Sequence, residues 1–107
     1  MTVKRYTVKI EEEAQLQIED LETYISENDS PKTASEYCDR IYDFCESLTT
    51  FPKRFTHRDD IREGFYEAGF ERRATITYSI NDTEDIVTVF GVYYGGQDWE
   101  LTSRISL

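Results

Sequence analysis

The sequence predicts an α+β domain in which an antiparallel helical hairpin packs on one face of a small, largely antiparallel β-sheet. Three observations support this prediction. Residues 3–10 alternate like a half-buried strand, residues 11–51 carry two helical apolar stripes, and residues 65–94 contain three strand candidates. A chain of 107 residues has room for one hydrophobic core, so we expect residues 1–107 to form a single domain.

The N-terminal strand is predicted from Tyr6, Val8 and Ile10, which share one face and are separated by polar residues. From Glu11 onward the apolar residues recur every three or four positions, which indicates an amphipathic helix. Glutamates in its first turn lie near the positive end of the helix dipole, where they are favourable. The apolar positions of this helix are Ala14, Ile18, Leu21 and Ile25.

A second helix is predicted to begin at Pro31, with Ser30 as its N-cap, and to end at Phe51 because Pro52 disfavours helical backbone in the residue before it. The connection to the first helix is short, which favours an antiparallel hairpin. The apolar stripe of the second helix is Ala34, Tyr37, Cys38, Ile41, Phe44, Cys45, Leu48 and Phe51.

The two cysteines belong to that stripe. Cys38 and Cys45 are separated by about 10 Å along a helix axis, which is beyond disulfide reach. We therefore expect two unlinked thiols that face the sheet together with Ile41 and Leu48, as in a reducing cytosol.

The C-terminal half predicts most of the sheet. Residues 53–64 are expected to form a charged loop, residues 81–84 a hairpin turn, and residues 97–107 have no assignment. The last strand is apolar on both faces, which indicates an interior strand with side chains packed on each side. The three strand candidates are residues 65–70, 74–80 and 86–94.

The formal net charge is −10, with half of the twelve basic side chains between residues 51 and 73. Because an acidic chain repels phosphates at long range, direct binding of nucleic acid is disfavoured. No apolar run is long enough to cross a membrane and the N-terminus has no leader-like segment, so we expect a cytoplasmic protein without a membrane partner.

The residues expected to contact a partner are basic or aromatic. A basic loop cluster, which Asp59 and Asp60 could neutralise, is formed by Lys53, Arg54, His57 and Arg58. Strand alternation would place the adjacent Arg72 and Arg73 on opposite faces, one toward a partner or both as surface charges. The full candidate set is Lys53, Arg54, Arg58, Arg62, Arg72, Arg73, Tyr93, Tyr94 and Trp99. The aromatic members are common interface anchors, but for Tyr94 and Trp99 a place in the core is slightly favoured.

The residues favour neither catalysis nor a bound cofactor. His57 is the only histidine, and neither it nor the cysteine pair has the spacing of a metal site. The glycine pair Gly95–Gly96 opens no helix that would bind phosphate. We therefore expect no metal, no cofactor and no catalytic residue that the sequence can identify.

Several motifs along the chain, taken together, have a characteristic order and spacing. They are Ser30–Ala34, Leu48–Arg54, Arg58–Gly64, Gly69–Arg73, Ile76–Tyr78 and Tyr94–Glu100. With these motifs the sequence resembles the ParE/RelE superfamily of bacterial type II toxins from about Val3 to Glu100, and is most similar to the ParE or plasmid-stabilisation branch.

The resemblance implies a cognate antitoxin whose flexible C-terminal segment wraps the toxin, as a hetero-oligomer or around a toxin dimer. It also implies ParE-like inhibition of DNA gyrase, or alternatively RelE-like cleavage of messenger RNA on the ribosome. The net charge opposes entry into a phosphate-lined site, and no histidine lies near Tyr93 and Tyr94, where some RNA-cutting relatives have one. Gyrase inhibition is therefore favoured.

Three positions depart from the family pattern. Tyr66 and Gly91 stand where the family often has arginines, and Phe55 stands where a glycine is common. The loss of two positive charges leaves open a third interpretation, a non-toxic relative that is retained as a protein-binding module.

Overall fold

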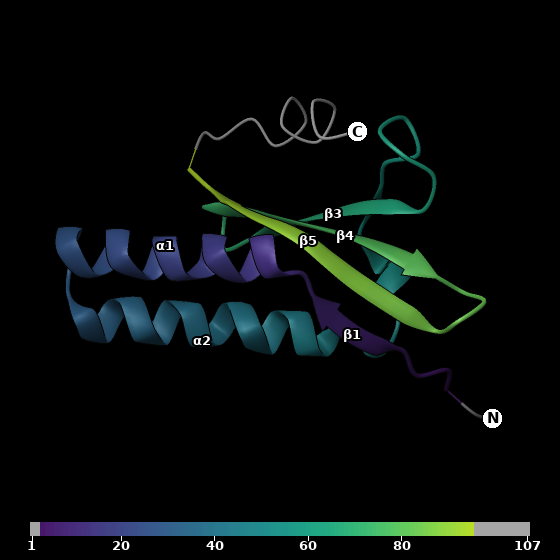
Figure 1. The fold of residues 1–107 in the computed structure, drawn as a ribbon, viewed down its shortest axis with the longest axis horizontal. Coiled ribbons are helices and arrows are strands. Elements are labelled where there is room, and N and C mark those ends of the chain that lie inside the picture. Colours follow the sequence, from purple (N-terminus) through teal and green to yellow (C-terminus); the bar gives the residue numbers. More distant parts are fainter. Residues whose placement is uncertain (1–2, 96–107) are drawn as a thin grey trace.

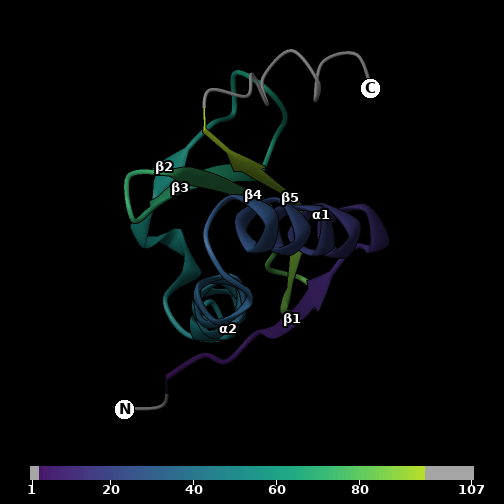
Figure 2. The ribbon, with the colours of Figure 1, turned by 90° about the vertical axis from the view of Figure 1, so that its left-hand side faces the viewer.

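The computed structural model describes residues 3–95, which form an α+β fold with both helices on one face of a five-stranded sheet (Figure 1). The sheet order is β1-β5-β4-β3-β2, and viewed along the helices, α1 lies nearest β5 (Figure 2). The elements are β1 (Thr7–Ile10), α1 (Glu12–Asn28), α2 (Pro31–Ser47), a 3₁₀ turn (Pro52–Arg54), β2 (Thr56–His57), β3 (Phe65–Phe70), β4 (Ala74–Asn81) and β5 (Ile86–Tyr94).

The helical hairpin forms where its sequence signals predict. The Ser30 hydroxyl caps α2 by accepting a hydrogen bond from the Thr33 backbone N–H at 3.0 Å, and Pro31 occupies the first turn. The prediction that α2 runs to Phe51 is wrong. The backbone tightens at Leu48, whose N–H bonds to the Cys45 carbonyl, and Phe51 adopts a left-handed conformation with φ of 51°.

The sheet is mixed, because β1 pairs in parallel with β5 while the other three pairs are antiparallel. The predicted N-terminal strand is too long, since only residues 7–10 pair with β5. Before them, the Tyr6 N–H bonds instead to the Thr49 carbonyl at 2.8 Å. The predicted loop 53–64 is also wrong in part: it begins within the 3₁₀ turn and contains β2, which extends the sheet beyond β3.

The β3–β4 connection is a tight turn of three residues, 71–73. Glu71 and Arg72 both have positive φ, 49° and 62°, and the Arg73 N–H donates to the Phe70 carbonyl at 3.1 Å. The β4–β5 turn begins one residue later than predicted, because Asn81 still pairs with Ile86.

The main core lies between the hairpin and the sheet. It contains both cysteines, which are free and buried with Ile41 and Leu48, as predicted. The Cys38 sulfur also contacts α1, since it lies 3.8 Å from the Ile18 carbonyl oxygen. No helix among residues 3–95 is long and apolar enough to span a membrane.

The face of the sheet opposite the helices, which we call its open face, holds a smaller apolar cluster. Phe65 and Tyr93 are buried there, with Ile61 and Phe90 packed against them. Val87 and Val89 point to the main core from the same strand. Side chains therefore pack on both faces of β5, which lies between β1 and β4, and the prediction of an interior strand is confirmed.

Candidate functional site

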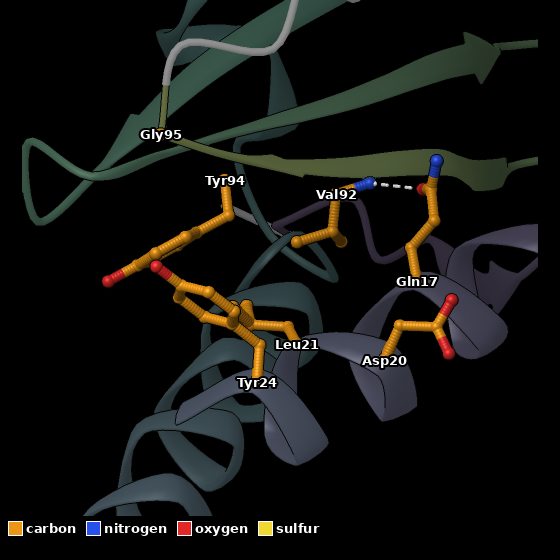
Figure 3. A pocket seen from close by; sticks show the side chains of 7 residues that line it. All are labelled: Gln17, Asp20, Leu21, Tyr24, Val92, Tyr94 and Gly95. Carbon is orange, nitrogen blue, oxygen red and sulfur yellow. Dashed lines mark hydrogen bonds between the residues drawn. The ribbon is translucent and has the colours of Figure 1, made fainter. Parts of the chain in front are cut away.

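An open groove of about 380 Å³ separates α1 from the end of β5 (Figure 3). Helical periodicity places its α1 residues on one side, and strand alternation places Val92 and Tyr94 on the other. The lining residues are Gln17, Asp20, Leu21, Tyr24, Val92, Tyr94 and Gly95. We call this feature the α1–β5 groove.

Two aromatic rings, one from α1 and one from β5, lie at one end of the α1–β5 groove and form what we call its aromatic wall (Figure 3). The Tyr24 ring, 54% exposed, lies 6.0 Å from the Tyr94 ring, and Tyr94 in turn meets Tyr37 edge-on at 5.9 Å. Tyr37 is buried, and its hydroxyl has no hydrogen-bond partner among the described residues. Burial raises the pKa of Tyr37 to about 12, so its hydroxyl stays neutral at physiological pH. The aromatic wall is thus rich in aromatic area and is backed by the buried Tyr37 ring.

The β5 side of the groove is a strand edge whose Val92 N–H is bound by a side chain. Because β1 ends opposite Val89, no strand among residues 3–95 flanks β5 beyond that point on this edge. The Val92 backbone N–H points toward α1 and donates to the Gln17 Oε1 at 2.7 Å (Figure 3). The side-chain amide of Gln17 therefore takes the place of a neighbouring strand's carbonyl.

The helical hairpin beside the groove carries the whole net charge of the protein. Residues 11–47 contain twelve acidic and two basic side chains, so the remaining residues are neutral in sum. One of the two bases, Arg40, is bound to Glu71 at 2.7 Å. Asp20 lies on the rim of the groove and has no ion-pair partner among the described residues. The field at the groove is negative.

The predicted basic cluster is neutralised within the protein. Arg58, whose side chain is 17% exposed, binds Asp60 and Glu67, each at 2.8 Å. Lys53 binds Asp82 at 2.8 Å. Arg54 turns back onto the chain and donates to the Thr50 and Phe51 carbonyls. These three residues are not brought together as one free basic patch.

The remaining predicted arginines are exposed. Arg62 lies over the Phe65 and Phe90 rings, with its guanidinium carbon 5.4 and 5.6 Å from their centroids. Arg72 and Arg73 are exposed at the β3–β4 hairpin, and neither forms an ion pair with the described residues. The prediction that the pair points to opposite faces of a strand is wrong, because Arg72 occupies the turn with a left-handed backbone.

Tyr93 fills the position that Gly91 leaves open. A Cβ atom on Gly91 would lie 2.7 Å from the Tyr93 hydroxyl oxygen and 2.8 Å from its Cζ atom. Tyr93 is buried on the open face of the sheet, near Phe65. An arginine at position 91 would therefore displace the tyrosine ring. The packing of Tyr93 over position 91 thus requires a glycine there and leaves no room for a charged side chain.

Tyr66 is also part of the packing. It is buried, and its ring stacks between His57 at 4.6 Å and Tyr78 at 5.5 Å. His57 itself binds Asp59 at 2.8 Å. Phe55, the third departure, packs against Phe44 at 5.2 Å. The three departures from the family pattern are therefore aromatic or small residues that fit their surroundings.

The described residues hold no group of three or more His, Cys, Asp or Glu side chains arranged for a metal ion. Of the predicted site residues, only Tyr94 lines the α1–β5 groove, and Trp99 lies outside the described residues. The sequence did not identify Gln17, Asp20 or Tyr24. Tyr24 gave a usable signal, an aromatic residue on the polar face of α1, whereas Gln17 gave none.

The chain as a whole is similar to known toxins. A family model described as the ParE toxin of the type II toxin-antitoxin system, parDE, matches residues 8–99. No curated protein matches the chain by sequence.

Three solved structures share the fold. The chromosomal ParDE system from P. aeruginosa superposes with a TM-score of 0.73 at 11% identity, covering 86% of this chain and 98% of that one. The RelBE2 complex from Mycobacterium tuberculosis has a TM-score of 0.60 at 21% identity, with 84% and 98% covered. A mutant of E. coli RelE in the free state has a TM-score of 0.66 at 11% identity, with 95% and 96% covered.

Proposed function

This chain belongs to the ParE toxin family of type II toxin-antitoxin systems, and we propose that it inhibits DNA gyrase and is neutralised by a cognate antitoxin. The observation that carries the choice of gyrase is the open face of the sheet. Its arginine Arg58 is bound by two carboxylates, and the Tyr93 ring covers the position of Gly91. Such a face suits a protein target better than a polyanion.

Cleavage of RNA on the ribosome needs groups that bind phosphate and transfer protons. Among residues 3–95 the one histidine, His57, is paired with Asp59 near the β2 edge, away from Tyr93. The net charge of −10 opposes entry into a phosphate-lined site. These features support gyrase inhibition over the RNA-cutting alternative.

The proposed gyrase contacts are the exposed cations at the β3–β4 hairpin and the aromatic side chains near the end of β5. Arg72 and Arg73 keep their charges free of ion pairs with the described residues, and Tyr94 lies at the adjacent end of β5. The Gly95 N–H donates to the Arg73 carbonyl at 2.8 Å, which fixes the two segments side by side. Trp99 is proposed as a further contact to gyrase. The protein would act in the cytoplasm.

The test is to express the chain from an inducible promoter without any antitoxin and to measure growth. The purified protein is then assayed for inhibition of gyrase supercoiling and, separately, for ribosome-dependent cleavage of messenger RNA. We expect growth arrest and gyrase inhibition, both relieved by the small protein encoded next to this gene. Cleavage without gyrase inhibition would replace the proposal by the RelE-like function.

A matched pair of variants tests the proposed contacts. Arg72→Ala removes an exposed charge from the hairpin, and Lys32→Ala removes one from α2, where the side chain is 85% exposed. We expect Arg72→Ala to weaken gyrase inhibition and Lys32→Ala to leave it unchanged. An absence of toxicity and of both activities in the wild-type chain would favour the non-toxic relative.

A further inference from the structure

We propose that the α1–β5 groove binds a short, extended, lysine- or arginine-bearing segment of a partner protein, which displaces the Gln17 side chain from the edge of β5. The inference rests on the proposed function in one respect, that the segment belongs to the neutralising antitoxin. The chemistry of the segment follows from three features of the groove: the strand edge, the aromatic wall and the charge.

The strand edge favours an extended segment. The Val92 N–H already uses an acceptor supplied from outside the sheet, at 2.7 Å. A β-strand offers a backbone carbonyl in that position, whereas a helix has bonded its own carbonyls internally. Because only residues 90–94 of β5 extend beyond β1 on this edge, the paired segment is short.

The aromatic wall favours apolar side chains at alternate positions of that segment. Leu21 and Val92 are apolar residues that line the groove from its two sides, and the Tyr24 side chain that lines it with them is more than half exposed. An extended chain directs every second side chain to the same face, so one or two apolar residues would cover these groups.

The charge of the hairpin favours cationic side chains at the other positions. Asp20 lies on the rim, and the hairpin around it contributes the entire net charge of −10. An acidic segment would be repelled along the whole length of α1. Charge complementarity therefore selects a basic partner segment over an acidic one.

In this proposal the Gln17 side chain occupies the hydrogen-bonding position of the partner strand until that strand binds. Its amide satisfies the edge in the free protein and must leave when a strand pairs with Val92. Removing the acceptor should therefore strengthen binding, by between about twofold and tenfold, the worth of one net hydrogen bond.

The direct test uses two blocked eight-residue peptides, one alternating lysine with valine and the other glutamate with valine. Their binding to the full chain is followed by NMR, with the backbone amide signals of Val92 and Gly95 as reporters. We expect the lysine peptide to shift these signals and the glutamate peptide to leave them unchanged. Shifts confined to other surfaces, or equal shifts with both peptides, would overturn the proposal.

Two matched pairs of variants locate the interaction. Asp20→Lys and Asp43→Lys change the net charge equally, but only Asp20 lines the groove. We expect Asp20→Lys to weaken binding of the lysine peptide about fivefold more than Asp43→Lys does. Gln17→Met keeps the side-chain length and removes the acceptor, so it should bind more tightly, while Gln15→Met on the same helix should not. Equal effects within either pair would refute the proposal.

The result is separable from the proposed function. If the antitoxin neutralises both the wild type and Asp20→Lys with equal affinity, the groove proposal fails and the toxin function stands. If the peptide results hold but the chain inhibits neither growth nor gyrase, the toxin function fails and the groove remains a peptide-binding site.

Discussion

Replacing Tyr78 by phenylalanine isolates one buried hydrogen bond that joins the sheet to the segment after α2. The Tyr78 side chain is fully buried, and its hydroxyl donates to the Pro52 carbonyl oxygen at 2.6 Å. Tyr78→Phe removes only the hydroxyl, so the aromatic packing against Tyr66 is retained. The Pro52 carbonyl, in a residue that is itself buried, then loses this donor.

The expected loss in the free energy of unfolding is about 1–3 kcal/mol, because a buried acceptor left without its donor costs more than an average hydrogen bond contributes. For a domain of this size, that loss corresponds to a decrease in Tm of roughly 4–15 °C. Urea unfolding followed by circular dichroism measures the change, provided that the slope m is the same for both proteins.

Tyr42→Phe is the matched control. Tyr42 lies on α2 with 40% of its surface exposed, where water can solvate the hydroxyl, so its replacement should change stability by less than about 0.5 kcal/mol. Equal stability losses in the two variants would refute the reasoning, because the hydrogen bond to Pro52 would then contribute nothing beyond a generic effect of removing a hydroxyl.

Three further predictions follow from the packing and the charges. Burial raises the pKa of Cys45 to about 12. The free energy of unfolding should therefore fall as the pH rises above about 9, because the unfolded chain releases the thiol proton there while the folded protein retains it. Urea unfolding between pH 7 and 10.5 should show a smaller fall for Cys45→Ala than for the wild type. Hydrogen bonds from Lys53 and Tyr6 hold the pKa of Asp82 well below its usual range, which stabilises the fold above about pH 4 and is lost as the pH falls. Asp82→Asn should therefore cost about 1 kcal/mol at pH 7, limited by the half-exposed carboxylate, and less at pH 3; an equal cost at both pH values would contradict this. Gly91→Ala should destabilise by roughly 1–3 kcal/mol in thermal unfolding because its Cβ overlaps the Tyr93 ring, whereas Gly69→Ala, which meets no atom within 4 Å, should not.

The local elements could be predicted because their signals are local. The Ser30–Pro31 pair defines the start of α2, and the apolar periods of three and four define both helices, since capping and amphipathicity depend on residues within one or two turns. The ends of the elements were predicted less accurately. The stripe continues to Phe51, but the helix stops at Ser47 because the chain after it turns to contact Tyr6 and Tyr78.

The candidate site was harder to predict, because the positions of its charges depend on contacts between distant segments. Lys53, Arg54 and Arg58 are close in sequence, but Lys53 pairs with Asp82 of the β4–β5 turn and Arg58 pairs with Glu67 of β3. No periodicity in the sequence reports such a pairing. A charge-based prediction therefore identified a basic cluster that the folded protein neutralises.

The sequence by itself determined the helical hairpin, the interior character of β5 and the concentration of negative charge on the helices, because periodicity and composition are properties of the chain. Only the tertiary structure decided that β1 pairs in parallel with β5 and ends opposite Val89, and that Gln17 therefore meets the Val92 N–H, which no strand of the sheet binds. These residues lie 75 positions apart. Their contact depends on the register of the sheet and the placement of α1 upon it, which the packing of the whole core fixes.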